Sequence, residues 1–230
     1  MPNYMKVMIN IKIVALSGII IVVCFFSLYA WASPGKVNVS DFSRGVDKNG
    51  IPVGWELLEK SGSPVMDRRK GEEFYYLNFA SNSSSFGLKK SIKVDVEEYP
   101  YLYFKWMVKK LPKGGDFRKK ETDDQAAQVY VVFGRIELFA KMIGYVWDSS
   151  APKLINGVSP AWDDLRIIVL QSGREKLREW VLEKRNVFDD YMNLFGKEPS
   201  NAHYISIYIN SQHTGTTAES CFAEIFFSKK

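Results

Sequence analysis

Polar side chains that could bind a ligand or take part in catalysis lie at the start of an apolar segment, residues 125–133. Asp123 and Asp124 precede it, and Gln128 and Tyr130 alternate within it. Successive residues of a strand point to opposite faces, so Asp124, Gln128 and Tyr130 share one face. Carboxylate, amide and phenol groups can hydrogen-bond a polar ligand. We expect these three side chains to line a groove; the alternative is that the two aspartates are solvated turn residues.

A second pair of charged residues, Glu183 and Arg185, shares one face of another predicted strand. The planar guanidinium of arginine suits carboxylates, including those of uronic acids. This pair could therefore clamp a sugar. The alternative is an ion pair that only stabilises the fold.

Two tryptophans stand at predicted strand ends or in loops, Trp147 before Asp148 and Trp162 before Asp163. Loop residues carry function more often than core residues, and an exposed aromatic ring can stack on the apolar face of a ligand. We expect these two rings, rather than mid-strand Trp106, to bind a ligand. The alternative is that they are part of the core.

These residues must be positioned by strands, because period-two alternation bounded by Gly, Pro, Asn and Ser dominates the chain. Residues 186–195 are the best helix candidate, with Asn186 as N-cap and Gly196 as the stop. Many short strands and one helix predict an antiparallel β-sandwich, a jelly roll, in a single domain. Residues 137–143 are equally consistent with a helical turn and a hairpin end. The predicted strands are residues 36–42, 54–58, 74–80, 86–96, 101–108, 125–133, 142–147, 165–170, 180–184, 203–209 and 221–227.

Residues 109–124 form a charged stretch with Pro112 and Gly114-Gly115 between two strong strands. A solvated hairpin loop accounts for this composition. Loops of this length between strands are also often functional.

The N-terminal segment is typical of a secretory signal. Lys6 and Lys12 precede an uncharged apolar run from Ile13, and Ala30-Trp31-Ala32 supplies small residues where a signal peptidase cleaves. We expect cleavage after Ala32, which leaves residues 33–230 as one periplasmic or secreted domain. The alternative is an uncleaved inner-membrane anchor with the domain facing the periplasm, since residues 13–29 are just long enough to span a bilayer.

The composition excludes several classes of protein. The 230 residues are 46% apolar and 25% charged, as in globular proteins, with a formal charge of +5. Removing Lys6 and Lys12 with the signal lowers this charge to +3. We therefore predict no nucleic-acid partner, and membrane contact only through an uncleaved N-terminal segment. Cys221 is then the single cysteine, so an intramolecular disulfide is excluded.

Three segments resemble one bacterial family. They are Trp106–Phe133 with Leu-Pro-Lys-Gly-Gly-Asp, Ile143-Gly-Tyr-Val-Trp147, and residues 183–196 with Glu-Lys-Arg-Asn-Val. Together they resemble the exported family known as domain of unknown function 3047, a resemblance that implies a relative without implying a reaction. The segment 209–215, Ile-Asn-Ser-Gln-His-Thr-Gly, departs from the acidic segment that the family has there, which puts any cation-binding role of that segment in doubt.

Asp41-Phe42, the turn Asn49–Trp55 and the acidic Glu224 in the last strand are similar to features of galactose-binding-type jelly rolls and carbohydrate-binding modules. This resemblance implies a galactose-binding-like sandwich, and Asp41 and Glu224 as oxygen ligands of a structural calcium ion. The sequence predicts no other cofactor, because His203 and His213 lack metal-ligand spacing and the chain has no phosphate-binding Gly-rich loop.

Three functions remain open. The first is a noncatalytic exported domain that binds carbohydrate or another envelope ligand. The second is a polysaccharide lyase or hydrolase that uses Asp124, Glu183 or Arg185. The third is a structural envelope protein that acts through protein contacts, which an exposed apolar patch would favour.

Overall fold

The computed structural model describes residues 13–16, 19–22, 35–134 and 140–230. The chain divides into two compact units, Met1–Pro34 and Gly35–Lys230. In the first unit, β1 (Ile13–Leu16) and β2 (Ile19–Val22) form an antiparallel pair. Most of the predicted signal lies outside the described residues, so cleavage and anchoring stay predictions. None of the described helices has the length and apolar character needed to cross a bilayer.

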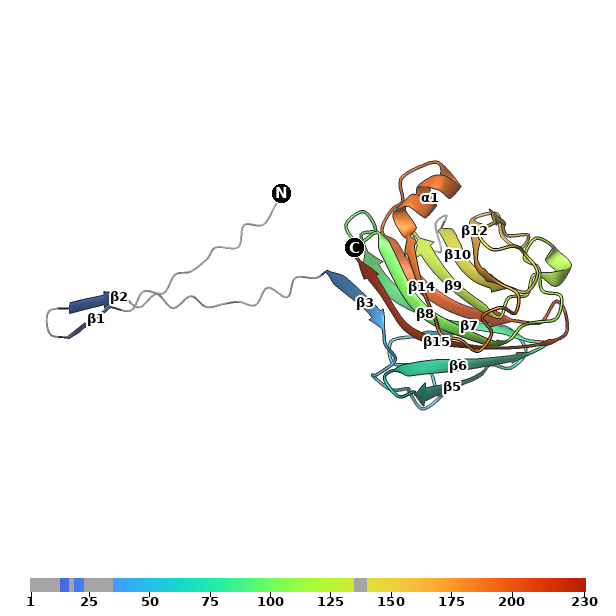
Figure 1. The fold of residues 1–230 in the computed structure, drawn as a ribbon, viewed down its shortest axis with the longest axis horizontal. Helices are drawn as coiled ribbons and strands as arrows, with labels where there is room; N and C mark the ends of the chain where they lie inside the picture. Colours follow the sequence, from blue (N-terminus) through green and yellow to red (C-terminus); the bar gives the residue numbers. More distant parts are fainter. Residues whose placement is uncertain (1–12, 17–18, 23–34, 135–139) are drawn as a thin grey trace. The chain divides into compact units, whose positions relative to one another are not determined.

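The second unit is mainly β, as predicted, with two sheets in a sandwich (Figure 1). One sheet has seven strands in the order β11-β12-β10-β9-β14-β7-β4. Its strands are β4 (Glu56–Ser61), β7 (Ser85–Val94), β9 (Ala127–Phe133), β10 (Lys141–Asp148), β11 (Asn156–Val158), β12 (Leu165–Ser172) and β14 (Ala202–Asn210).

The other sheet has six strands, in the order β13-β8-β15-β6-β5 with β3 also paired to β15. Its strands are β3 (Lys36–Ser40), β5 (Val65–Lys70), β6 (Tyr75–Asn82), β8 (Tyr101–Lys110), β13 (Val181–Asn186) and β15 (Thr217–Ser228). The pairs are antiparallel except β10 with β12, which is parallel.

Each of the eleven predicted strand segments overlaps one strand of the second unit. The prediction missed β5 and β11. Of the ambiguous segment 137–143, residues 137–139 lie outside the described part, and β10 begins at Lys141.

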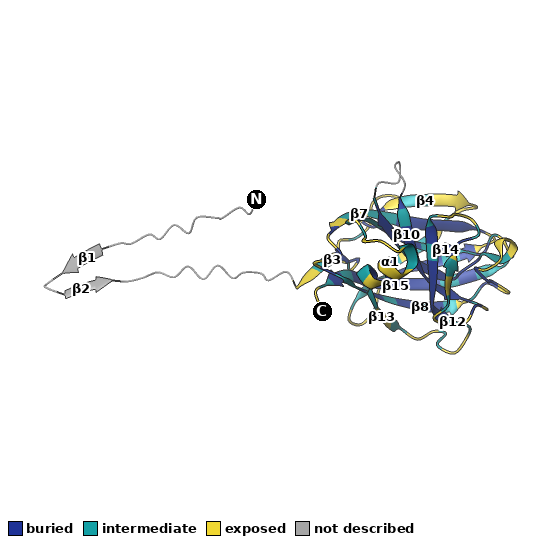
Figure 2. Ribbon diagram, turned by 90° about the horizontal axis from the view of Figure 1, so that it is seen from above, coloured by how far each residue is buried: buried dark blue, intermediate teal, exposed yellow. Residues whose placement is uncertain are grey.

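The core lies between the two sheets. On β8, Leu102, Phe104, Trp106 and Val108 are buried, while the residues between them are only half-buried. The Trp106 ring meets Trp147 of the opposite sheet at a centroid distance of 5.9 Å. Burying each such aromatic side chain stabilises the fold by about 1.5–3 kcal/mol. Strand β10 is buried along most of its length, whereas edge strand β4 is largely exposed (Figure 2).

A second apolar cluster covers part of the outer face of the seven-stranded sheet. Phe117, from the charged loop after β8, packs with Val132, Val146 and Ile167. This cover explains why β9 is buried on both faces near β10. The outer face toward β14 and β7 carries the half-buried residues described below.

Helix α1 (Val187–Phe195) confirms the helix prediction. The Asn186 side chain accepts a hydrogen bond from the Asp189 N–H, and Gly196 ends the helix at φ 68°. A left-handed residue at this position favours glycine. Tyr191 packs edge-on against Phe133 at 4.6 Å, which attaches the helix to one end of the sandwich.

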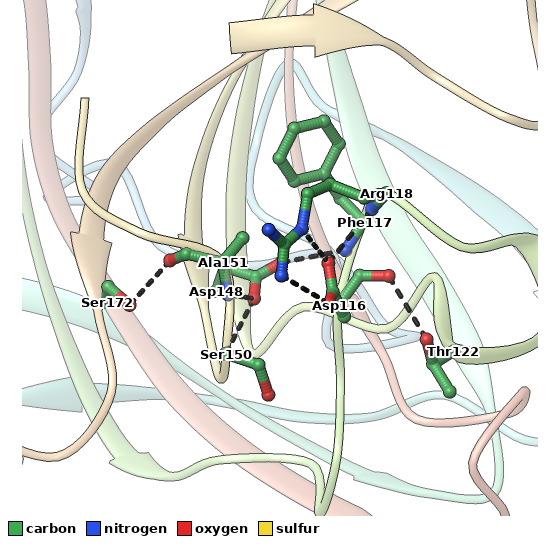
Figure 3. A network of polar contacts seen from close by, with 8 residues as sticks. All are labelled: Asp116, Phe117, Arg118, Thr122, Asp148, Ser150, Ala151 and Ser172. Carbon is green, nitrogen blue, oxygen red and sulfur yellow. Dashed lines mark hydrogen bonds and ion pairs between the residues drawn. The ribbon is translucent and has the colours of Figure 1, made fainter. Parts of the chain in front are cut away.

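The charged loop is held at defined points rather than solvated throughout. It contains a short 3₁₀ helix, η1 (Lys120–Thr122). The buried Asp148 carboxylate accepts hydrogen bonds from the backbone N–H groups of Phe117, Ser150 and Ala151 (Figure 3). These bonds connect the loop to the segment that follows β10.

Candidate functional site

The outer face of the seven-stranded sheet brings Gln128 and Tyr130 of β9 together with Tyr208 of β14. In the β9–β14 register, Tyr208 lies opposite Gln128. The Tyr130 hydroxyl donates to Gln128 Oε1, and Gln128 Nε2 donates to Asn210 Oδ1 at 2.7 Å. We call Tyr130, Tyr208, Gln128 and Asn210 the tyrosine face.

Two glycines allow the tyrosine rings to lie flat on the sheet. A Cβ atom on Gly144 would be 2.8 Å from Tyr130 Cε1, and one on Gly87 would be 2.6 Å from Tyr208 Cδ1. No side chain larger than hydrogen therefore fits beneath either ring without displacing it. The two ring centroids are 5.3 Å apart with 33° between their planes. The pair forms a half-buried aromatic surface beside two side-chain amides.

Burial raises the pKa of both phenols on the tyrosine face. The pKa of Tyr208 rises to about 12, and that of Tyr130 lies well above its usual value, with the charge of Asp123 adding to the effect of burial. Both hydroxyls are consequently protonated at neutral pH, so each can donate a hydrogen bond.

Asp123 lies near this face with a perturbed carboxyl group. Burial raises its pKa to about 6, against opposing effects of the hydrogen bond from Gln125 and the charge of His213. The Gln125 amide donates to Asp123 Oδ1 at 3.0 Å. A carboxyl group that titrates near pH 6 can exchange protons at ordinary pH, which makes Asp123 a functional candidate.

Asp124 faces a backbone loop rather than a groove. Its side chain is completely buried and accepts hydrogen bonds from the backbone N–H groups of His213 and Thr214, the latter at 2.7 Å. These contacts fix the turn between β14 and β15. The expected grouping of Asp124 with Gln128 and Tyr130 fails because Asp124 precedes the first residue of β9, where regular alternation does not apply.

Glu183 and Arg185 share one side of β13, as expected, but they do not pair with each other. Glu183 Oε1 accepts hydrogen bonds from Trp106 Nε1 at 3.3 Å and Gln171 Nε2 at 2.6 Å, which links the two sheets. Arg185 forms an ion pair with buried Asp190 of α1, to which Tyr145 also donates at 2.7 Å. Both side chains already have protein partners in the structure.

The two tryptophans have opposite environments. Trp147 is a strand residue with no exposed surface, and its Nε1 donates to the Gly173 carbonyl at 3.1 Å. The expectation of a loop platform is wrong for this residue because its parity on β10 directs the ring into the core. Trp162, in the turn before β12, is 45% exposed, and its ligand-binding role stays a prediction.

Asp41 and Glu224 have separate partners. Asp41 accepts hydrogen bonds from the backbone N–H and hydroxyl of Ser43, while Glu224 pairs with Lys36 at 3.4 Å. The hydrogen bonds from Ser43 are the main cause that lowers the pKa of Asp41, and the positive charge of Lys90 adds to it. Across the described ranges, no three His, Cys, Asp or Glu side chains are grouped to hold a metal ion. The calcium site stays a prediction without support from these contacts.

The structure therefore joins Gln128 and Tyr130 and separates them from Glu183 and Arg185, which lie on the other sheet. The sequence did not point to Tyr208 or Asn210, nor to the raised pKa of Asp123. The alternation Tyr204-Ile-Ser-Ile-Tyr208 in β14 carries a signal for Tyr208, since it places two tyrosines on the face opposite the apolar residues. Nothing in the sequence gives the register that sets Tyr208 beside Gln128.

Comparison with known proteins gives one family assignment. Residues 62–226 match the family described as protein of unknown function (DUF3047). The chain belongs to the DUF3047 family. This confirms the resemblance noted from segments 106–133, 143–147 and 183–196. No curated protein matches the chain.

Several solved structures resemble this DUF3047 protein at low identity. A family 30 carbohydrate-binding module of a Clostridium thermocellum cellulosomal cellulase has a TM-score of 0.45 at 11% identity, covering 85% of this chain and 98% of that one. The xyloglucanase domain of NopAA from Sinorhizobium fredii has a TM-score of 0.41 at 10% identity, covering 77% and 94%.

The active domain of tailspike protein 4 of bacteriophage CBA120 has a TM-score of 0.39 at 10% identity, covering 82% of this chain. This chain spans only 21% of the length of that tailspike domain. All three TM-scores are below 0.5, so we base the function on this chain's own residues.

Proposed function

We propose that this protein is an exported, noncatalytic domain that binds carbohydrate on the tyrosine face. The observation that carries the proposal is the pair of rings laid flat over Gly144 and Gly87. Sugar rings present an apolar C–H face and a hydroxyl rim. Flat aromatic rings complement the first, and the phenol hydroxyl of half-buried Tyr208 complements the second.

Export rests on the N-terminal pattern, with Lys6 and Lys12 before the apolar run and Ala30-Trp31-Ala32 after it. We place the domain in the periplasm or outside the cell, with an uncleaved inner-membrane anchor as the alternative. N-terminal sequencing of the exported protein tests this. A chain that begins at Ser33 supports cleavage, and one that keeps Met1 or Met5 contradicts it.

The arrangement of carboxylates supports binding over hydrolysis. Glycoside hydrolases hold two carboxyl groups about 5–9.5 Å apart across the scissile bond. Near the tyrosine face, half-buried Asp123 could supply one such carboxyl group, but Asp124 and Asp148 are completely buried and accept hydrogen bonds from backbone N–H groups. Glu56 lies three strands away from β9, which at about 4.8 Å per strand is roughly 14 Å.

The test is binding of the purified protein to a panel of envelope polysaccharides by isothermal titration calorimetry. Tyr130→Ala and Tyr208→Ala should each weaken binding about tenfold, because each removes one stacking surface. Tyr130→Phe keeps the ring and should lose less.

Tyr103→Ala is the matched control, since Tyr103 is a half-buried tyrosine that stacks on Phe226 in the other sheet at 4.8 Å. It should leave affinity unchanged. If the folded protein binds no polysaccharide, or if the tyrosine-face variants bind as tightly as the wild type, the proposal is wrong.

A further inference from the structure

A cavity lined by the end of β8 and the charged loop lies apart from the tyrosine face. It has a volume of about 910 Å³ and opens between the end of β8, the segment after β10 and the connection from β12 to β13. Sites for ligands of drug-like size are typically about 300–1,000 Å³. The charged loop within residues 109–124 supplies one wall, from Leu111 to Gly114.

The charge of this cavity is strongly positive. Its lining holds five cationic side chains and one carboxylate, that of Glu219. Glu219 is already paired with Lys109, whose Nζ lies 2.9 Å from Glu219 Oε1 and 2.7 Å from Asn78 Oδ1. The other four cations form no ion pair within the described residues. We call these four the basic rim: Lys110, Lys113, Arg174 and Arg178.

The walls that carry the basic rim are fixed by hydrogen bonds. Ser149 Oγ donates to the Pro112 carbonyl at 2.7 Å, and the Lys113 N–H donates to Thr216 Oγ1 at 3.1 Å. The Asp148 contacts in Figure 3 hold the same two segments together. A rigid site avoids part of the ordering cost of binding.

Arg178 has a backbone conformation that ordinary residues avoid. Its φ is +68°, in the left-handed region, and its N–H donates to the Val108 carbonyl at 2.8 Å. Glycine adopts this conformation at lower cost, so the arginine is kept here at an energetic disadvantage. Strain of this kind concentrates at functional sites. The left-handed backbone conformation of Arg178 is an observation independent of the positive charge of the cavity.

The lining of the cavity also includes four apolar residues, Met107, Leu111, Pro112 and Leu177. An anion with an apolar face therefore fits better than a small inorganic ion. Arginine guanidinium groups bind planar carboxylates through two parallel hydrogen bonds. An acidic sugar combines a carboxylate with an apolar C–H face.

We infer that this cavity binds a uronate-containing polysaccharide through the basic rim. The site is separate from the tyrosine face, so the inference goes beyond the proposed function and either one can fail alone. Lys110 and Lys113 come from the end of β8 and the loop after it, and Arg174 and Arg178 come from the connection between β12 and β13.

The experiment is calorimetric titration of the purified protein with an oligogalacturonate, its carboxyl-reduced neutral counterpart, and pyrophosphate. The oligogalacturonate should bind, and its affinity should fall as salt increases because the exposed charges are screened. The neutral counterpart should bind at least about tenfold more weakly. Equal binding of the neutral sugar, or tighter binding of pyrophosphate, overturns the inference.

The decisive variant is Arg178→Gly, which removes the charge and suits the left-handed φ. It should fold at least as stably as the wild type while oligogalacturonate affinity falls about tenfold, and adding Arg174→Gln should lower affinity further. Lys48→Gln, an exposed lysine in the turn before β4, is the charge-matched control and should bind normally. Unchanged affinity in the Arg174/Arg178 double variant contradicts the inference, whatever the result at Tyr130 and Tyr208.

Discussion

Two regions of this sandwich combine tyrosine with aspartate and differ in how the aspartate is satisfied. Beside α1, the buried Asp190 carboxylate receives hydrogen bonds from Tyr145 and an ion pair from Arg185. At the tyrosine face, Asp123 receives one side-chain hydrogen bond, from Gln125, and its pKa is raised to about 6. The same residue types form a hydrogen-bonded ion pair in the first region and leave a carboxyl group with a raised pKa in the second.

The largest expected effect on stability comes from removing the ion pair between Asp190 and Arg185. Asp190→Asn leaves the Arg185 guanidinium without its carboxylate, and removing one partner of a buried pair costs about 3 kcal/mol of unfolding free energy. Urea denaturation measures this change. Glu59→Gln, an exposed carboxylate on β4, should change stability by less than about 0.5 kcal/mol. A loss below about 1 kcal/mol for Asp190→Asn would remove the contrast between the two regions.

The second effect is a dependence of stability on pH, which we expect from Asp123 at the tyrosine face. Because the pKa of Asp123 rises from 3.8 to about 6 on folding, the folded state holds its proton more tightly than the unfolded state. The stabilisation from protonated Asp123 is complete below pH 3.8 and is lost as pH rises through 6. Wild type should therefore lose about 2 kcal/mol relative to Asp123→Asn between pH 3.5 and 7. Parallel curves for the two proteins, from urea denaturation at each pH, would contradict the raised pKa.

A smaller change in the free energy of unfolding tests whether the N-cap of α1 helps to position Asp190 beside Arg185. Asn186→Ala removes the cap on the Asp189 N–H and should cost about 1 kcal/mol in urea denaturation. Asn193→Ala, an exposed helical residue, is the control and should be close to neutral. If both variants behave alike, the cap does not contribute to positioning Asp190.

The smallest effect concerns Glu224, which makes a surface ion pair with Lys36, both about half-exposed. Glu224→Gln should change stability by less than about 0.5 kcal/mol. Calcium should leave the melting temperature of wild type and variant unchanged. A calcium-dependent rise in wild type that Glu224→Gln abolishes would establish the metal site that the resemblance to galactose-binding-type jelly rolls implies.

Alternation predicted most of the sandwich, because a strand between a core and solvent must alternate. It failed for β5, whose sequence Val-Met-Asp-Arg-Arg-Lys is that of a charged edge strand. It also failed for β11, which has three residues around Gly157. The parallel pairing of β10 with β12 depends on long-range contacts that local patterns do not encode.

The site was less predictable than the fold because partners depend on register. Parity correctly placed Glu183 and Arg185 on one side of β13, but it could not show that Gln171 and Asp190 would satisfy them. Parity placed Gln128 and Tyr130 together because both lie within β9. It failed for Asp124, which lies outside the strand.

The position of β15 in the six-stranded sheet has a consequence for how the chain is made. Residues 217–228 pair with β3, β6 and β8, so the interior of that sheet forms around a strand that a ribosome synthesises after the sheet's other described strands. Until this strand emerges, β6 and β8 lack their shared neighbour, and the contacts that close the sheet span most of the chain. Folds dominated by such non-local pairings form slowly. We therefore expect the six-stranded sheet to close only after residues 217–228 have been synthesised.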